Sequence, residues 1–391
     1  MAQIHWKLTP TARYVLLVLF ILFGVHSILS FTHEPYGRAT SISQLTGGFS
    51  WSTAAAPPAI PDAYYDDTPL PLTPAHNTSA RANATILMLA RNSDVDGAVR
   101  SIRELEDRFN HKYQYPWVFL NEEDFDDEFK RRVTNIISGP VHFGRIPHDH
   151  WYQPAWIDED RASAARQKMM DDNIIYGGSV SYRNMCRFNS GFFYRHQLLQ
   201  QFKWYWRVEP DVHFRCDVDF DPFRYMEDHN KVYGFTITMY EYLATIPTLW
   251  ETVKEFTKAH PEYVKENNAM NYMSDDGGTT YNNCHFWSNF EIADMDFWRG
   301  EAYSKYFEYL DSKGGFYYER WGDAPVHSIA AGLFASKDQI HFFDDIGYEH
   351  NPYTHCPRGP GAWERGHCDC EVQKSFDYDG YSCMRQWDRI Q

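Results

Sequence analysis

The residues with the clearest chemical potential lie in the stretch 203–221. It begins with aromatic and β-branched residues typical of a strand and then places Glu209 and Asp211 on either side of Pro210. Carboxylates just past the end of a buried strand lie where an open α/β sheet presents its ligands. Oxygen ligands suit Mg²⁺ or Mn²⁺, and such an ion can hold a diphosphate that bare acids would repel. The pair therefore indicates a nucleotide-sugar transferase, although a solvated turn explains the same short triplet equally well.

A second group of candidates lies in the last third of the chain, between residues 281 and 353. Glu291, Asp323 after a glycine, and His350 in a loop bounded by glycine and proline are its main members. These residue types serve sugar binding, acid/base work and nitrogen ligation of Mn²⁺. A lone histidine such as His350 is more often structural, so the types alone do not assign a site.

Two arginines form a third candidate group. Arg183 and Arg187 are four residues apart in a segment of helical pattern, so they share one face of the expected helix. Two guanidinium groups on one face suit a diphosphate. Two surface arginines on an acidic protein are an equally good interpretation of the same spacing.

The surrounding pattern predicts the elements that position these residues. Apolar strand-like runs alternate with amphipathic helical stretches, which indicates a doubly wound α/β sheet with a nucleotide-binding half. The expected strands are 84–90, 117–120, 140–146, the run before Glu209 and 231–240; the expected helices are the one carrying Val95 to Phe109, then 125–137, the mostly helical 152–202, and 248–259.

Composition limits the function classes. The chain has 391 residues, 43% of them hydrophobic, and a net charge of −16, so a folded domain is expected and nucleic acid is not an expected partner. Aromatic residues reach 17%, which suits stacking on sugar rings, although a rich core explains most of them. The sequence contains no P-loop, GxSxG or HExxH motif, which removes several NTPase and hydrolase classes.

The cysteines are expected to form disulfides if the domain is lumenal. We expect most of the seven to pair and at least one to stay free, with the connectivity left open. Cys368 and Cys370 are too close in sequence to bridge each other easily, so each should reach elsewhere. The seven are Cys186, Cys216, Cys284, Cys356, Cys368, Cys370 and Cys383.

The N-terminal region predicts a membrane anchor. Residues 1–13 form a short basic tail and 14–31 an apolar run long enough to span a bilayer, with the positive charge on the cytosolic side. A cleaved signal peptide is the alternative. Residues 32–83 are rich in Ser, Thr, Ala and Pro, which predicts a flexible or extended stem that holds the domain away from the membrane. The expected catalytic domain, 84–391, is then lumenal.

Six motifs carry a family resemblance, and they occur in a fixed order over about residues 84–356. They resemble the fungal Golgi α-1,2-mannosyltransferases of glycosyltransferase family 15. The motifs are LARNSD (89–94), YRNMCRF (182–188), RVEPDVHFRCD (207–217), CHFWSNFEIAD (284–294), ERWGDAPVHS (319–328) and GYEHNPY (347–353).

The resemblance implies a GT-A-like fold with a mixed central sheet, GDP-mannose as donor, Mn²⁺ as cofactor and retention of configuration. The implied acceptor is the 2-hydroxyl of a terminal α-mannose on O- or N-linked glycoprotein glycans. The implied location is the Golgi membrane, with a single-pass type II anchor and a role in cell wall mannan.

The same resemblance assigns residue roles. Glu291 is expected nearest the anomeric carbon, either attacking it or stabilising an oxocarbenium-like transition state. Of the remaining residues, Glu209 and His350 are expected at the metal, Tyr182 at the donor phosphates, Asp211 at the metal or ribose, and Arg207 and Asp323 along the donor or acceptor pocket.

Three other functions fit parts of the pattern. An enzyme of the same fold could make a different linkage or transfer mannose phosphate. A non-catalytic lumenal glycan-binding protein is the second, and intact Glu209, Glu291 and His350 speak against it. A lumenal glycosidase is the third, and it requires two carboxylates flanking the bond and no nucleotide.

Overall fold

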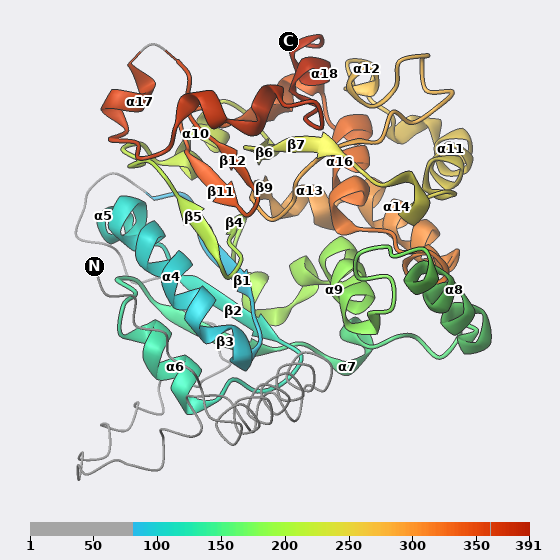
Figure 1. Cartoon of the computed structure of the whole chain (residues 1–391), viewed down its shortest axis with the longest axis horizontal. Helices are drawn as coiled ribbons and strands as arrows, with labels where there is room; N and C mark the ends of the chain where they lie inside the picture. The colour runs from blue at the N-terminus through green and yellow to red at the C-terminus, as the bar shows by residue number, and fades with distance from the viewer. Residues whose placement is uncertain (1–80, 360) are drawn as a thin grey trace, which may run out of the picture. The chain divides into compact units, whose positions relative to one another are not determined.

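A computed structural model describes residues 81–359 and 361–391. Figure 1 shows this part of the chain in colour. The predicted tail, the anchor at 14–31 and nearly all of the predicted stem lie outside the described residues. Within the described residues, no helix combines the length and apolar character needed to cross a bilayer.

A seven-stranded sheet forms the centre of the fold, in the order β10-β6-β9-β4-β1-β2-β3. Neighbouring strands run parallel except β9, which is antiparallel to both β4 and β6. The predicted α/β fold with a mixed central sheet is therefore confirmed. Its strands are β1 (Ala84–Leu89), β2 (Trp117–Asn121), β3 (Val141–Arg145), β4 (Trp204–Arg207), β6 (Tyr233–Phe235), β9 (Glu291–Asp294) and β10 (Ile340–Phe342).

Helices cover both faces of the sheet (Figure 1). Successive side chains of β1 alternate between the two cores, because Ile86 and Met88 belong to one and Leu87 to the other. Helices α4 and α6 pack on the first side, and α9, α14 and α16 on the second. Continuous apolar strands of this kind are buried on both faces, as the sequence pattern predicts.

The helices agree with the amphipathic stretches, with shorter bounds in several cases. They are α4 (Val95–Leu105), α5 (His111–Tyr113), α6 (Asp127–Thr134), α7 (His148–Trp151), α8 (Glu159–Asp171), α9 (Val180–Gly191), α10 (Pro222–Asp228), α11 (Leu249–Ala259), α12 (Met270–Met273), α13 (Met295–Arg299), α14 (Glu301–Ser312), α15 (Gly315–Tyr318), α16 (Asp323–Phe334), α17 (Ala362–Arg365) and α18 (Met384–Asp388).

Two small sheets lie beside the large one. The run 231–240, predicted as a single β segment, is divided between β6 in the central sheet and β7 (Thr238–Tyr240), which pairs with β8 (Cys284–Phe286). The other small sheet joins β5 (Val212–Phe214), β11 (Tyr348–His350) and β12 (Tyr353–His355). In it, Val212 lies opposite His350, so two distant motifs meet.

The described residues contain three disulfides, of which two fasten the segment 356–383 to the rest of the domain and one closes a loop within it. The bonds are Cys216–Cys368, Cys284–Cys383 and Cys356–Cys370, and Cys186 is free and buried. The predictions of extensive pairing, one free thiol and separate partners for Cys368 and Cys370 are confirmed. The connectivity, which the sequence left open, ties residues 356–383 to β8 and to the chain just after β5.

Candidate active site

Arg207 lies at the centre of the candidate site. It is the last residue of β4, and only 8% of it is exposed. Its guanidinium group donates to Asp323 Oδ2 at 2.6 Å and to Glu209 Oε1 at 2.5 Å, and lies 3.9 Å from Glu291 Oε1. Three carboxylates from separate segments therefore share one buried cation.

The charges of this cluster are coupled. Burial opposes ionisation of Arg207, yet Asp323, Glu209 and Glu291 outweigh it and raise the pKa of Arg207 well above its usual value. Burial alone would raise the pKa of Asp323, but Arg207 and His327 lower it below its usual value. Arg207 and Asp323 thus each favour the charged form of the other.

Glu291, the predicted catalytic carboxylate, is 1% exposed and lies directly opposite Arg207 in the β4–β9 pairing. Its Oε1 accepts a hydrogen bond from Tyr205 at 2.8 Å. Its Oε2 lies 3.1 Å from Tyr233 Oη and 3.0 Å from His327 Nδ1. Side chains from β4, β6 and α16 thus fix both oxygens of this carboxylate.

Glu209 and His350 face each other at the edge of this cluster. Glu209 Oε2 lies 3.7 Å from His350 Nε2, and both side chains are partly exposed. His350 Nδ1 lies 3.2 Å from the backbone carbonyl of Asn351, so Nδ1 donates there and Nε2 is the nitrogen that faces Glu209. The structure therefore brings the two predicted metal ligands together, with Glu209 Oε2 and His350 Nε2 facing each other.

Asp323 and Tyr182 lie on the helices that border the cluster. Asp323 is the first residue of α16, where the helix dipole favours an anion, and Ser288 donates to its Oδ2 at 2.9 Å. The ring of Tyr182, on α9, stacks on exposed Tyr176 at 4.4 Å. Burial raises the pKa of the Tyr182 hydroxyl well above its usual value, so it stays a neutral hydrogen-bond donor.

Sequence reasoning missed Arg320, which lies over the Tyr182 ring at 5.1 Å. Arg320 is 5% exposed, and its Nε is buried without a hydrogen-bond partner. No carboxylate pairs with it in the part of the chain that the structure describes. The sequence signal was its place in the motif at 319–328, where only the neighbouring aspartate drew attention.

Arg183 and Arg187 are held by internal contacts. Arg183 is fully buried, donates to the backbone carbonyls of Glu319 and Ser179, and burial lowers its pKa to about 10. Arg187 forms a two-pronged pair with Asp311, with both contacts at 2.8 Å. The structure does not bring either guanidinium group into the Arg207 cluster, and the predicted diphosphate contact gains no support from these positions.

Asp211 also turns away from Glu209. Its side chain pairs with Arg100 on α4, and its φ of +63° reverses the chain direction after Pro210. A Cβ at Gly97 would lie 2.6 Å from the Asp211 carboxylate, which explains the glycine. The two acids on either side of Pro210 thus have different partners, Arg207 for Glu209 and Arg100 for Asp211. The role of Asp211 at the metal or the ribose stays a prediction.

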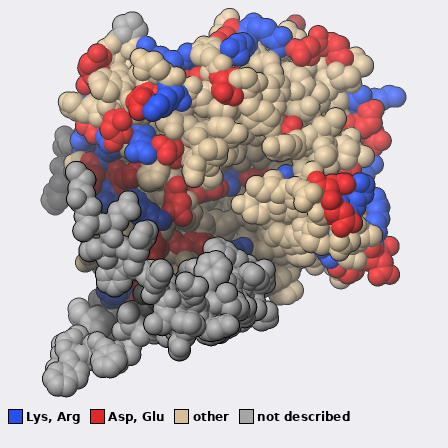
Figure 2. Space-filling model, viewed as in Figure 1, with Lys and Arg blue, Asp and Glu red and all other residues tan. Residues whose placement is uncertain are grey.

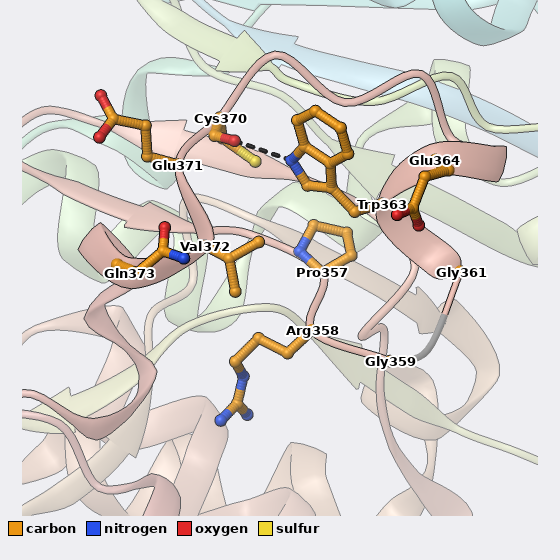
Figure 3. Close-up of a pocket in the computed structure, with 10 residues that line it drawn as sticks. All are labelled: Pro357, Arg358, Gly359, Gly361, Trp363, Glu364, Cys370, Glu371, Val372 and Gln373. Carbon is orange, nitrogen blue, oxygen red and sulfur yellow. Dashed lines mark hydrogen bonds between the residues drawn. The ribbon is translucent and has the colours of Figure 1, made fainter.

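Two depressions are visible on the surface. Figure 2 shows a hollow across the middle of one face with acidic side chains along it, over the region where Figure 1 places β4, β5 and β11. Figure 3 shows a different pocket of about 490 Å³ whose lining contains none of the predicted site residues. It is lined by Pro357, Arg358, Gly359, Gly361, Trp363, Glu364, Cys370, Glu371, Val372 and Gln373.

Comparison with known proteins identifies the chain as a glycosyltransferase. A family model described as glycolipid 2-alpha-mannosyltransferase matches residues 61–391. The chain belongs to this family. The enzyme class predicted from the sequence, an α-1,2-mannosyltransferase, is thereby confirmed over the lectin and glycosidase alternatives.

Two curated relatives and two solved structures illustrate the similarity. Glycolipid 2-alpha-mannosyltransferase 2 of Candida albicans is 57% identical over 78% of this chain and 67% of its own length. Alpha-1,2 mannosyltransferase KTR1 of Saccharomyces cerevisiae is 53% identical over 80% of both. The S. cerevisiae mannosyltransferase Ktr4p in complex with GDP is 44% identical, with a TM-score of 0.76 over 79% of this chain and 82% of that chain. The Mn/GDP form of Aspergillus fumigatus core-mannan synthase A is 41% identical, with a TM-score of 0.76 over 86% of this chain and 92% of that chain.

The contacts of Arg187 generate the first prediction. Arg187→Ala leaves Asp311, whose side chain is only 15% exposed, without its partner, so we expect the free energy of unfolding to fall by up to about 3–5 kcal/mol. Arg187→Ala with Asp311→Ala should recover part of this loss, as urea unfolding of the single and double variants will measure. Weaker GDP binding with unchanged stability would instead assign Arg187 to the donor.

The lowered pKa of Asp323 generates a pH prediction. A carboxyl group whose pKa is lower in the folded state contributes stability above its unfolded pKa of about 4 and loses it as pH falls through the folded pKa. We expect Asp323→Asn to be less stable at pH 7 but to lose less stability than the parent below about pH 4. Chemical unfolding across the acid range checks this, and parallel curves would contradict it.

Proposed function

We propose that this enzyme transfers mannose from GDP-mannose to the 2-hydroxyl of a terminal α-mannose on O- or N-linked glycoprotein glycans, with Mn²⁺ and with retention. We also propose a GT-A-like catalytic domain held in the Golgi lumen by an N-terminal type II anchor. The observation that carries the activity is the Arg207 cluster, in which a locked carboxylate lies beside an open pair of metal ligands.

The residues present fit Mn²⁺. Glu209 Oε2 and His350 Nε2 direct lone pairs at each other across 3.7 Å, and carboxylate oxygen with imidazole nitrogen is a donor set that Mn²⁺ accepts. No group of three or more ligating side chains occurs within residues 81–359 and 361–391, which leaves coordination positions for diphosphate and water. When bound, the ion supplies positive charge for the leaving diphosphate. The Mn/GDP form of the Aspergillus relative supports this assignment.

Arg207 prepares this pair by holding the other oxygen of Glu209 at 2.5 Å. This contact orients the carboxylate with Oε2 toward His350. The Asn351 carbonyl fixes the His350 tautomer in the same way. The protein thus orients both ligands before the donor arrives.

Tyr182 and Arg320 are the residues we assign to the donor's phosphate groups. A buried guanidinium group without an anionic partner is costly unless a ligand supplies the anion. A diphosphate matches its fork of donors, and the neutral Tyr182 hydroxyl adds one more donor. This assignment replaces Arg183 and Arg187, whose donors are engaged elsewhere.

Glu291 is the residue we assign to the anomeric centre. Direct attack and charge stabilisation both require an ionised carboxylate. Donation from Tyr205 and Tyr233, together with Arg207 at 3.9 Å, favours that form. Both retaining routes therefore start from the same prepared anion.

Aromatic side chains beside the metal ligands suit a sugar acceptor. Trp287 lies 4.8 Å from the ring of His350 and 5.6 Å from that of Tyr353. Exposed Tyr242 lies 6.1 Å from Tyr381. Flat rings of this kind stack on the apolar faces of mannose.

The activity is tested by product analysis with the full-length chain, GDP-mannose, Mn²⁺ and α-methyl mannoside. We expect an α-1,2-linked dimannoside. Addition of EDTA should abolish its formation, because chelation removes the charge that the leaving diphosphate needs. Glu291→Gln should bind GDP normally and lose transfer, and His350→Ala should require more Mn²⁺. Product in a different linkage, or transfer unaffected by EDTA, would overturn the corresponding part of the proposal.

Arg320 gives a separate prediction. Arg320→Ala should raise the KM for GDP-mannose and the Kd for GDP by roughly 10- to 100-fold, because a hydrogen bond to a charged group contributes about 1.5–3 kcal/mol. The KM for α-methyl mannoside should stay unchanged, and Arg320→Lys should show a smaller loss. Equal GDP affinity combined with a lower Tm would show that Arg320 only supports packing.

A further inference from the structure

We infer that His327 is a positioning residue that holds a proton on both ring nitrogens and thereby keeps Glu291 ionised and oriented. The inference rests on the proposed role of Glu291. His327 lies on α16, is fully buried, and contacts Glu291 Oε2, whereas Arg207 lies nearest Oε1. No role was predicted for it from the sequence, although it belongs to the motif at 319–328.

Both ring nitrogens of His327 face acceptors. Nε2 lies 3.0 Å from the backbone carbonyl of Asn189, and Nδ1 lies 3.0 Å from Glu291 Oε2. A carbonyl oxygen only accepts, so Nε2 must carry a proton. A neutral ring would then present the Nδ1 lone pair to Glu291. The contact is therefore made either by an imidazolium with a carboxylate or by a neutral ring with a protonated Glu291.

The other contacts of Glu291 decide between these two states. Trp298 Nε1, which only donates, gives its proton to Tyr205 Oη at 3.0 Å, so the Tyr205 proton points to Glu291 Oε1. Tyr233 donates to Oε2 at 3.1 Å. A carboxylate that receives this many hydrogen bonds is favoured in its charged form. The shared proton therefore belongs to His327.

The surroundings of His327 also favour a cation. The indole of Trp298 stacks on the imidazole at 4.4 Å, and Tyr303 on α14 lies at 6.0 Å. Asp323, one helical turn earlier on α16, adds negative charge. Arg207 on β4 is an opposing charge near the pair, and its nearest contacts are with Asp323 and Glu209.

The consequence for catalysis is that Glu291 stays ionised and in a fixed orientation, while the proton between the two side chains stays on His327. The Asn189 carbonyl keeps the remaining proton on Nε2, so loss of a proton would turn the Nδ1 lone pair of His327 toward Glu291. Glu291 would then lose one of its three donors and its orientation. Turnover should therefore fall at alkaline pH, while donor affinity should not, because His327 contacts neither of the residues assigned to the donor's phosphate groups.

Two variants separate the two contacts of the ring. An asparagine amide reaches the position of Nδ1, so His327→Asn keeps a donor to Glu291 without a titrating charge. A glutamine amide reaches the position of Nε2, so His327→Gln keeps the contact with Asn189 and loses the one with Glu291. We expect kcat to fall roughly 10- to 100-fold in His327→Gln and less in His327→Asn, with the KM for GDP-mannose unchanged in both.

The protonation state is read directly by ¹⁵N NMR of the histidine rings in the full-length protein. The His327 signal, identified by its absence in His327→Asn, should show two protonated nitrogens at neutral pH in the parent and one in Glu291→Gln. The alkaline limb of kcat should be present in the parent and missing in His327→Asn. A singly protonated His327 in the parent, or turnover within twofold in both variants, would overturn the inference. The NMR result stands whether or not Glu291→Gln abolishes transfer, so the two proposals fail separately.

Discussion

The structure of the site depends on one buried cation, Arg207. Charged groups can be buried in a protein only when they are paired and hydrogen-bonded, and three acids isolated in this interior would strongly favour protonation. Arg207 removes that cost for Asp323 and Glu209 by direct contact and for Glu291 by proximity. The enzyme can therefore place several carboxyl groups beside a site that must accept an anionic donor.

Sheet topology brings these groups to one place. β4 runs parallel to β1 on one side and antiparallel to β9 on the other. The first residue of β9 therefore lies opposite the last residue of β4. Glu291 can thus reach the carboxyl edge of the parallel strands although it begins its own strand. The pairing of β5 with β11 does the same for His350, since it lies opposite Val212, three residues after Glu209. A mixed sheet is therefore a requirement of this site.

Sequence reasoning predicted the elements whose pattern is local. The apolar runs predicted the strands, because burial leaves a periodic pattern of apolar residues. Glu209 was predicted as a site residue because it is an acid just past the end of such a run. The roles of Arg183 and Arg187 could not be predicted this way. Spacing placed both on one helix, but Asp311, more than a hundred residues away, determines what Arg187 contacts. Local spacing does not show contacts with distant segments, so the sequence did not single out His327 and Arg320. For the same reason it left the disulfide connectivity open.

The site combines a closed part with an open part, and Arg207 joins them. Glu291 has its donors built into the fold, with Tyr205, Tyr233 and His327 all buried. Glu209 and His350 are partly exposed, and their facing lone pairs remain to be satisfied by a ligand. Arg207 contacts Glu209 directly and Glu291 at longer range, so charge arriving at the open part changes the field at the closed part. A carboxylate that was free to rotate would adjust to that change. One held by three donors stays in place, and its fixed orientation lets it act on charge that develops only in the transition state.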